Sequence, residues 1–468
     1  MKYEDYYDEI YSKKHEKVVN NVKKPKSLLH FDYALGPKEA FKLVSNPENV
    51  EKHWFLPMLG FNLSIRRTYL EENKPGNVVK KRKNKDRPIR YASNRDAYIY
   101  TYYSYMFNKQ YEEYLSDKSF YHSPIAYRSL EKNNIDFAHT VFNKIKEIGE
   151  CTVICMDLTS FFDTLDHTIL YQNTLKILGQ TKFRPDQEKV LNSLTKYSFF
   201  DKDSVIRELG WTLQEFREIR SSILYKKGLT PDDSFFSFKQ IRSNKDSNGE
   251  WIIKKNPNRD NKKMVGIPQG TPISALLSNI YMIDFDQEIF EYTASKKGYY
   301  VRYCDDVLVI LPGQNCYRDI VTTINEILVR TAGNSLKINE GKTEAIQFYV
   351  AKEGLDYTNL LHPEKNFELQ YLGFNFNGKR TVIRHSSIAR YYRKLKSKLN
   401  TVKYRASKNE KKSTPYLRDI YQKYSHVSNK KTFISYVKLA SDVMGEKKIM
   451  RQVKNHMKFI KKVASEKT

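Results

Sequence analysis

The 468-residue sequence predicts an α+β fold that ends in a basic, helical C-terminal region. Two apolar, strand-like runs end in acidic residues, one at Asp157 and the other at Asp305 and Asp306. From Ile388 to Val402, apolar side chains recur every three or four residues, which is the spacing of an amphipathic helix. A chain of this length is expected to form two or three packed subdomains, so strands and basic helices can occupy different ones.

The charge of the chain indicates a polyanionic partner. It carries 81 Lys and Arg against 54 Asp and Glu, a net charge of +27, and its 40% hydrophobic residues suffice for a sizeable core. Residues 381–468 alone hold 24 Lys and Arg against 5 Asp and Glu. A solvated surface without a partner would fit a smaller excess, whereas a nucleic acid bound through its phosphates fits this one.

The sequence argues against several other classes of protein. The four cysteines form no paired zinc-binding pattern, and Cys151 and Cys155 lie in an apolar run typical of small buried side chains. No stretch approaches the roughly 18 apolar residues that span a bilayer. The first ten residues are acidic and rich in tyrosine, unlike a signal peptide. We therefore expect a cytoplasmic protein without a membrane partner.

Three segments carry local signals of their own. Lys74–Arg90 is basic, contains Pro and Gly, and predicts a loop. Asp201–Lys263 is polar, with turn signals such as Asn248–Gly249, and predicts an insertion. Phe367–Arg384 predicts two alternating strands joined at Asn377–Gly378, because both positions of such a turn need positive φ.

The first acidic group ends a strand. Apolar residues run from Cys151 up to Asp157, and Phe161, Phe162 and Asp163 then lead toward a helix. A carboxylate at the end of a buried strand is costly to desolvate unless it meets a cation or a strong donor. Asp157 is therefore a candidate metal ligand, with capping of the following helix as the alternative.

The second acidic group is a pair of neighbouring aspartates. Asp305 and Asp306 lie between the β-rich runs Tyr299–Cys304 and Val307–Ile310, which predicts a hairpin with two carboxylates at its tip. Adjacent carboxylates repel each other, and a divalent cation cancels that cost. By itself, an Asp pair at a turn is a moderate indication of a metal site.

A stiff loop lies between the two acidic groups. Val265–Ile280 holds Gln269 between Pro268 and Gly270 and continues as a helix that is apolar on one face. The glycine allows the backbone and the Gln269 amide to approach a flat ligand closely. A plain helix entry would not require a glutamine held in this way.

The order of these features resembles the palm of reverse transcriptases, which combines a strand-ending Asp, a Pro-Gln-Gly loop with its helix, and a Tyr-x-Asp-Asp hairpin. Further motifs are similar to those of the intron-related bacterial enzymes of this family. They are Arg87–Arg90 with Asn94–Asp96 in the fingers, Leu336–Thr343 after the catalytic hairpin, and Gln370–Phe374 in the primer grip. The resemblance covers about Val78 to Arg384.

The resemblance implies a right-hand polymerase fold, with fingers and palm and a basic α-helical thumb. It divides the chain into a helical N-terminal extension at 1–75, fingers and palm at 76–365, a primer-grip hairpin at 366–384, and a thumb-like region at 385–468. The insertion at about 200–263 departs from a compact palm.

The resemblance also implies the roles of individual residues. Asp157, Asp305 and Asp306 would be catalytic and would hold two Mg²⁺ ions, which prefer hard oxygen ligands. Phe162 would lie beneath the sugar and exclude a ribose 2′-hydroxyl group. Other expected contacts of the deoxynucleotide are Gln269, Arg87, Lys80 and Lys342, and Tyr371, Leu372 and Gly373 would form the primer grip. For Lys342, a solvated lysine at a strand end is the alternative.

Among reverse transcriptases, the chain resembles the stand-alone bacterial enzymes of the unknown group, many of them defence-associated and related to group II intron and retron enzymes. No integrase, ribonuclease H or His/Cys-rich endonuclease pattern follows the polymerase region, and the Val-Thr-Gly retron motif is absent. This resemblance implies a noncoding RNA as template, a DNA product, and a role in antiviral defence. A homo-oligomer is a further option.

Several alternatives stay open. They are a retron or intron-type enzyme of a mobile element, a template-independent or protein-primed DNA polymerase, an RNA-dependent RNA polymerase, and a nucleic-acid-binding protein with an inactive palm. Phe162 argues against ribonucleotide use, and the intact aspartates argue against an inactive palm. Two groups of tyrosines are candidate primers of DNA synthesis, but such rings more commonly pack helices or stack on bases. They are Tyr3, Tyr6, Tyr7 and Tyr11, and the tyrosines between Tyr98 and Tyr105.

Overall fold

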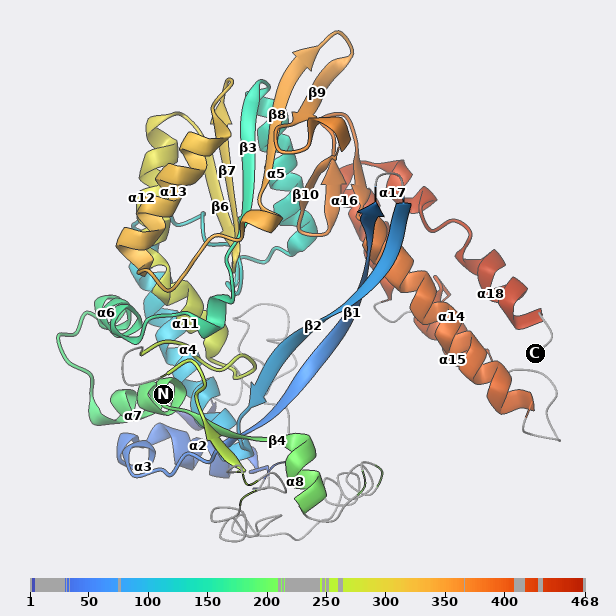
Figure 1. Cartoon of the computed structure of the whole chain (residues 1–468). Coiled ribbons are helices and arrows are strands. Elements are labelled where there is room, and N and C mark those ends of the chain that lie inside the picture. Colours follow the sequence, from blue (N-terminus) through green and yellow to red (C-terminus); the bar gives the residue numbers. More distant parts are fainter. Residues whose placement is uncertain are drawn as a thin grey trace.

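The computed structural model describes residues 2–4, 30, 32, 34–74, 77–208, 212, 214, 245, 249, 252–259, 264–365, 367–407, 417–427 and 432–465, and for 65–74 and 77–85 it describes the backbone. Three sheets and many helices confirm the predicted α+β class (Figure 1). Within the described ranges, no helix has both the length and the apolar character needed to cross a bilayer.

A five-stranded sheet forms the palm. Its strand order is β6-β7-β3-β8-β9, and every neighbouring pair is antiparallel. Its strands are β3 (Cys151–Asp157), β6 (Tyr299–Tyr303), β7 (Asp306–Pro312), β8 (Glu344–Ala351) and β9 (Gly354–Asn359). Side chains alternate between the faces, so Val307 and Val309 of β7 join one apolar core while Leu308 and Ile310 join another.

Different helices cover the two faces of the palm sheet (Figure 1). Helices α12 (Ile283–Ser295) and α13 (Tyr317–Ala332) pack on the face of Val307 and Val309. Helix α5 (Asn134–Ile148) packs on the opposite face, in the same apolar core as a small sheet and the C-terminal helices. The central strands are therefore buried on both sides, which explains why β7 is a continuous apolar run.

A second sheet and several helices form the fingers. The strand order is β2-β1-β4-β5, with β1 antiparallel to β2 and parallel to β4. These strands are β1 (Met58–Lys74), β2 (Asn77–Tyr91), β4 (Ser198–Asp201) and β5 (Ile253–Lys255). The helices of this region are α2 (Pro37–Ser45), α3 (Pro47–Glu51), α4 (Asn94–Ser116), α6 (His167–Leu178), α7 (Pro185–Thr195), α8 (Lys202–Glu208) and α11 (Ser274–Tyr281).

Two sequence-based expectations about this region are wrong. The sequence predicts a helical extension at 1–75, whereas residues 58–74 are β1, a strand of the fingers sheet. The sequence also predicts a loop at Lys74–Arg90, whereas most of that segment is β2. Antiparallel pairing with β1 satisfies the backbone groups of this lysine-rich strand, and local composition does not reveal such pairing.

The predicted insertion at about 200–263 starts in β4 and includes β5, both strands of the fingers sheet. Phe199 of β4 pairs with Met58 of β1, and Phe200 pairs with Ile253 of β5. Phe200 is completely buried, so β4 belongs to the fingers core and not to an appended unit. Apart from a few single residues, 209–251 lies outside the described part of the chain.

A small sheet of β10 (Leu369–Tyr371), β11 (Phe374–Phe376) and β12 (Thr381–Ile383) follows the palm. The hairpin predicted at Asn377–Gly378 joins β11 to β12, but only Gly378 has positive φ there. The two-residue turn with positive φ at both positions is instead Leu372–Gly373, between β10 and β11. A hydrogen bond from Asn134 Nδ2 to the Leu372 carbonyl (3.1 Å) helps to hold this unusual leucine conformation.

The C-terminal region consists of helices in the described residues and extends beside the palm (Figure 1). The helices are α14 (His385–Ser407), α15 (Arg418–Tyr424), α16 (Phe433–Met444), α17 (Lys447–Arg451) and α18 (His456–Ser465). Tyr391, Leu395 and Leu399 of α14 are buried in the core shared with α5, which confirms the predicted amphipathic helix.

The substitution Gly378→Ala tests the contact between the small sheet and the palm. The new Cβ would lie 2.6 Å from the carbonyl oxygen of Leu355 on β9, and the φ of +86° is itself unfavourable for alanine. We expect the free energy of unfolding to fall by roughly 2–5 kcal/mol, from the left-handed φ and the overpacking together. Urea denaturation measures this change.

Gly373→Ala is the matched control for that substitution. Gly373 also has a positive φ (+95°), but nothing lies within 4 Å of the added Cβ. We expect this variant to lose only about 1–2 kcal/mol. Equal losses in the two variants would show that β9 does not restrict position 378.

Candidate active site

The three predicted aspartates meet at one end of the palm sheet. Asp157, the last residue of β3, pairs in register with Asp306, the first residue of β7. Asp305 precedes it in the turn after β6, and its carbonyl oxygen accepts a hydrogen bond from the backbone NH of Leu158 (3.0 Å). All three aspartates are half-buried. The structure thus brings together carboxylates that are far apart in the sequence.

The charges of these aspartates act on one another. Burial, followed by the negative charges of Asp305 and Asp157, raises the pKa of Asp306 to about 7. Lys342 and Arg384 act in the opposite direction and keep this pKa from rising further. Asp306 therefore exchanges a proton near neutral pH in the free protein, and a bound cation would compete with that proton.

Lys342 forms an ion pair with Asp157. Its ammonium group contacts Oδ2 of Asp157, and the lysine side chain is 39% exposed. The backbone NH of Asn339 donates to the carbonyl oxygen of Asp157 (2.7 Å), and Leu158 forms a β-bridge with Ile338. The segment Leu336–Thr343 is therefore fastened to the end of β3. Lys342 is exposed, as in the alternative interpretation, but it is paired with a carboxylate.

The side chains at this end of the sheet suit a hard divalent cation. They supply only carboxylate oxygens, and their mutual repulsion is a cost that such a cation removes. Across the described ranges, no three His, Cys, Asp or Glu side chains are already arranged as a metal-binding cluster. The ammonium group of Lys342 already engages Oδ2 of Asp157. The chemistry of the residues fits Mg²⁺, and Lys342 would compete with such a cation for that oxygen.

The Pro-Gln-Gly loop packs against the segment that follows Asp157. The backbone NH of Ile267 donates to the carbonyl oxygen of Phe162 (2.9 Å), and the carbonyl oxygen of Gln269 accepts from the NH of Arg90 (2.8 Å). Gly270 permits this close approach, since a Cβ there would lie 2.7 Å from the carbonyl oxygen of Arg90. The loop therefore links the palm to strand β2 of the fingers.

Phe161 and Phe162 have different environments. Phe161 is buried in the core, whereas Phe162 is half-buried, and their rings meet edge to face at 5.6 Å. The sequence predicts that one ring of this pair belongs to the core, and the structure assigns that part to Phe161. Phe162 is the ring that remains accessible.

The predicted nucleotide-binding residues of β2 are described only in part. Arg87 is exposed, and the side chain of Lys80 lies outside the described residues. Because side chains alternate along a strand, Arg87 and Arg90 point to opposite faces of β2. The guanidinium group of Arg90 lies 3.9 Å from the ring of Phe199, and its buried Nε has no hydrogen-bond partner in the described part of the chain. Arg90, next to the Gln269 loop, is therefore a further candidate for a phosphate contact.

The predicted primer-grip residues lie on the α5 side of the palm. Leu372 and Gly373 form the tight turn, and the Tyr371 ring is buried, with no hydrogen-bond partner for its hydroxyl group among the described residues. Burial raises the pKa of Tyr371, with smaller contributions from Cys155 and Asp306. The predicted primer-grip turn is therefore packed in the core shared with α5.

Sequence reasoning missed Glu344 and Arg384 in this region. Glu344 accepts a hydrogen bond from the backbone NH of Gln370 (3.0 Å), and burial raises its pKa while Gln370 and Arg384 oppose that rise. Arg384 immediately precedes α14 and acts electrostatically on Glu344 and Asp306. No local signal distinguishes Arg384 from the many other basic residues nearby, because only the folded chain brings it to the aspartates.

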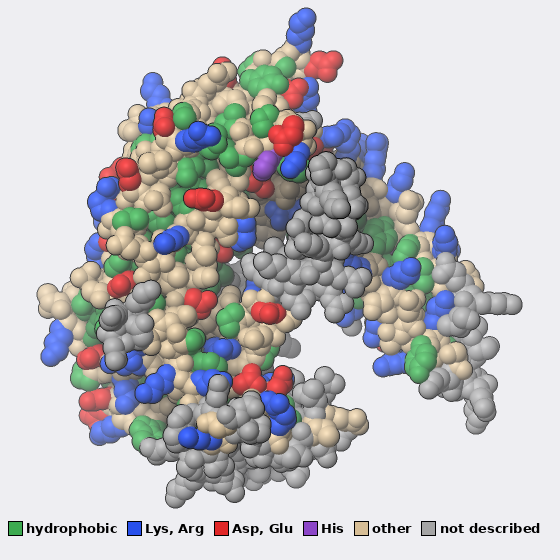
Figure 2. Space-filling view, viewed as in Figure 1, with side chains coloured by type: hydrophobic (Ala, Val, Ile, Leu, Met, Phe, Trp, Pro, Cys, Tyr) green, Lys and Arg blue, Asp and Glu red, His purple; other side chains and the backbone are tan. Residues whose placement is uncertain are grey.

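Basic side chains coat the outer face of α14. Figure 2 shows Lys and Arg side chains gathered over the C-terminal helices. The exposed ones of α14 are Arg390, Arg393, Lys394, Lys396, Lys398 and Arg405. This face is opposite the buried stripe of Tyr391, Leu395 and Leu399, so apolar packing and charge are separated on one helix.

The candidate primer tyrosines of α4 are mostly part of the core, and Tyr6, Tyr7 and Tyr11 lie outside the described residues. Tyr98, Tyr100, Tyr103 and Tyr105 of α4 are each at most 5% exposed. Burial also raises the pKa of Tyr100 and Tyr103, which disfavours their nucleophilic form. The packing interpretation therefore suits these residues.

Comparisons with solved structures give low overall similarity. The telomerase of Candida albicans, solved in complex with a TWJ fragment of telomeric RNA, is 10% identical, with 91% of this chain and 66% of that chain covered and a TM-score of 0.38. The apo telomerase of Candida tropicalis is 13% identical, with 88% and 59% covered and a TM-score of 0.39. The chain thus spans about two thirds or less of these telomerase chains.

Comparisons of sequence are more specific. No curated protein sequence matches the chain. Residues 80–376, more than half of the chain, match the family model described as reverse transcriptase (RNA-dependent DNA polymerase). That range contains the three aspartates, the Gln269 loop and the primer-grip turn. The chain belongs to the reverse transcriptase family of RNA-dependent DNA polymerases.

Proposed function

We propose that this chain makes DNA on an RNA template, with Asp157, Asp305 and Asp306 as its catalytic residues. The observation that carries the proposal is the pairing of Asp157 with Asp306 in neighbouring strands, with Asp305 in the adjoining turn. These carboxylates would hold two Mg²⁺ ions. When bound, such ions activate the 3′-hydroxyl group of the primer and neutralise charge on the triphosphate.

Lys342 has two roles in this proposal. In the free protein it neutralises Asp157 through their ion pair. If Asp157 held a cation, the ammonium group of Lys342 would be free to contact the triphosphate of the incoming nucleotide. It would then be placed to donate a proton to the leaving pyrophosphate.

Phe162 and Gln269 shape the pocket for the nucleotide. The half-buried ring of Phe162 would lie beneath the sugar, where it excludes a 2′-hydroxyl group. The Gln269 loop is tied to the backbone of both Phe162 and Arg90. Its backbone is therefore held between palm and fingers, beside Arg90 of β2, which would contact the triphosphate with Lys80 on the same strand.

The proposed template is a noncoding RNA, and the proposed setting is bacterial antiviral defence. The exposed basic face of α14 supports a nucleic-acid partner, because it offers many cations to a phosphate backbone. The burial of the α4 tyrosines favours a nucleic-acid 3′ end over those side chains as primer. The Tyr371–Gly373 turn would hold that primer end.

Replacement of Asp305 and Asp306 by alanine should abolish DNA synthesis without unfolding the protein. The variant loses cation-binding carboxylates worth several kcal/mol in the transition state, which corresponds to at least about a thousandfold in rate. Thermal stability in the absence of metal should stay the same or rise, because mutual repulsion is removed. Extension of a DNA primer on RNA, together with thermal unfolding, measures both effects.

Asp356→Ala is the control for that variant, because Asp356 is a half-buried carboxylate on β9 of the same sheet that pairs with Lys379. It should retain activity. Primer extension by the purified, folded double variant would disprove the catalytic assignment.

Phe162→Ala should reduce the preference for deoxynucleotides over ribonucleotides. A single steric contact is worth roughly 1–3 kcal/mol, so we expect a drop of about 10-fold or more in the selectivity ratio. Competition between the two nucleotide types in one reaction measures the ratio. Phe161→Leu is the control, since it alters only the core ring. An unchanged ratio in active Phe162→Ala would mean that another residue excludes the 2′-hydroxyl group.

The native protein should copurify with one predominant noncoding RNA, and incubation with deoxynucleotides should convert part of that RNA into a DNA copy. Sequencing of the bound nucleic acid before and after incubation tests this expectation. Cells that express the native chain should also resist phage infection better than cells with the Asp305 and Asp306 variant. A random RNA population, or equal plating of phage on both strains, would contradict the proposed template or setting.

A further inference from the structure

The turn that carries Asp305 is held in an uncommon conformation. Cys304 has a φ of +60°, a left-handed value that costs a non-glycine residue about 1 kcal/mol or more. Its carbonyl oxygen accepts a hydrogen bond from Nη1 of Arg302 (3.0 Å), and its side chain is buried. The residue before Asp305 is thus held through its backbone carbonyl and packed in the core.

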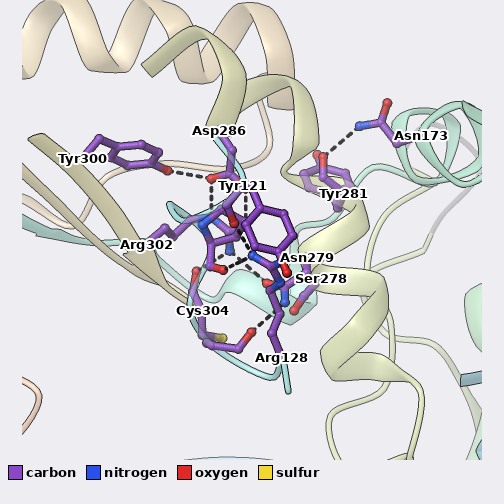
Figure 3. A network of polar contacts seen from close by, with 12 residues as sticks. Tyr121, Arg128, Asn173, Ser278, Asn279, Tyr281, Asp286, Tyr300, Arg302 and Cys304 are labelled. Atoms are coloured by element: carbon purple, nitrogen blue, oxygen red, sulfur yellow. Dashed lines mark hydrogen bonds and ion pairs between the residues drawn. The ribbon is translucent and has the colours of Figure 1, made fainter. Parts of the chain in front are cut away.

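The arginine that holds this carbonyl is completely buried. Arg302 and Asp286 have side-chain exposures of 0% each. Nε and Nη2 of Arg302 donate to the two carboxylate oxygens of Asp286 (2.7 and 2.6 Å), and the Tyr300 hydroxyl group donates to Oδ1 of Asp286 (2.6 Å; Figure 3). Two parallel bonds set the plane of the guanidinium group, so its remaining nitrogen points in one direction.

Stability alone does not account for this ion pair. Removing two charges from water costs several kcal/mol per ion, and buried ion pairs are often no more stabilising than well-packed apolar side chains. An apolar pair in the same space, however, has no donor to offer the carbonyl oxygen of Cys304. The ion pair therefore contributes a fixed orientation of Arg302, in which Nη1 points at the carbonyl oxygen of Cys304.

The same arginine also reaches the helix that follows the Gln269 loop. Nη1 of Arg302 donates to Oδ1 of Asn279 on α11 (3.3 Å), and Nδ2 of Asn279 donates to the carbonyl oxygen of Ala126 (2.8 Å). Asp286 lies on α12, the next helix. One buried polar network therefore connects the turn of Asp305 with the helices behind the nucleotide-binding loop (Figure 3).

We propose that Arg302, oriented by Asp286, is a positioning residue that sets the Asp305 turn for cation binding. The inference rests on the proposed function of the aspartates. It predicts that loss of the ion pair weakens cation binding and slows the chemical step, while the protein stays folded and binds nucleic acid normally.

The test uses an apolar variant, Arg302→Met with Asp286→Leu and Tyr300→Phe, in the full chain. This combination leaves no buried charge and no buried hydroxyl group of the network without a partner. We expect Mn²⁺ to bind at least about 10-fold more weakly by calorimetry, and kcat on an RNA–DNA primer-template to fall about 10- to 100-fold. The Kd for the primer-template, measured without metal, should stay unchanged.

The fingers offer a matched control. There Arg184 donates to both carboxylate oxygens of the buried Asp186 (3.1 and 2.9 Å), which also accepts from the Tyr103 hydroxyl group (2.5 Å). The variant Arg184→Met with Asp186→Leu and Tyr103→Phe removes the same groups away from the Asp305 turn. It should lose stability to a similar extent but keep native Mn²⁺ affinity and kcat.

The outcomes separate this inference from the proposed function. Native Mn²⁺ affinity and kcat in the folded apolar variant would overturn the inference. If the apolar variant does not fold, Arg302→Lys takes its place. Lysine keeps the positive charge but cannot bridge Asp286 and the Cys304 carbonyl. Native Mn²⁺ affinity and kcat in that variant would likewise overturn the inference. If the native protein itself does not extend the primer, the proposed function fails, and Mn²⁺ binding still decides the role of Arg302.

Discussion

The repulsion among Asp157, Asp305 and Asp306 is the constraint on which the arrangement of the palm depends. Antiparallel pairing of β3 with β7 brings Asp157 beside Asp306, and the turn before β7 adds Asp305. In the half-buried setting of the sheet end, this proximity and burial raise the pKa of Asp306 to about 7. The strands stay together despite the repulsion because both of their faces are packed in apolar cores.

Basic side chains act on the three aspartates in two different ways. Lys342 and Arg384 supply positive charge that acts directly on the aspartates. Arg302 is already paired with Asp286, so its contribution is the direction of one hydrogen bond and not net charge. Charge at the aspartates is therefore balanced by Lys342 and Arg384, a role that a bound cation would take over. The orientation of the Asp305 turn depends instead on Arg302, which is buried in the core.

The site also joins the three parts of the molecule. The Gln269 loop binds the backbone of β2 in the fingers and of Phe162 in the palm. Arg384, just before α14, opposes the rise in the pKa of Asp306, and its backbone NH donates to the carbonyl oxygen of Gly373 (2.9 Å). The basic face of α14 extends from that point, which suits the proposed nucleic-acid partner.

The sequence by itself determined the features that depend on near neighbours along the chain. These are the strand that ends at Asp157, the hairpin at Asp305 and Asp306, the loop and helix after Gln269, and the amphipathic α14, because side-chain periodicity and turn chemistry are local. Only the tertiary structure decided the pairing of β1 with β2 as a strand of the fingers, the contact of Lys342 with Asp157, and the placement of Arg384 and Arg302. Strand pairing and ion pairs join residues that are distant in sequence, and a lysine or arginine has the same local pattern whether it meets solvent or a carboxylate.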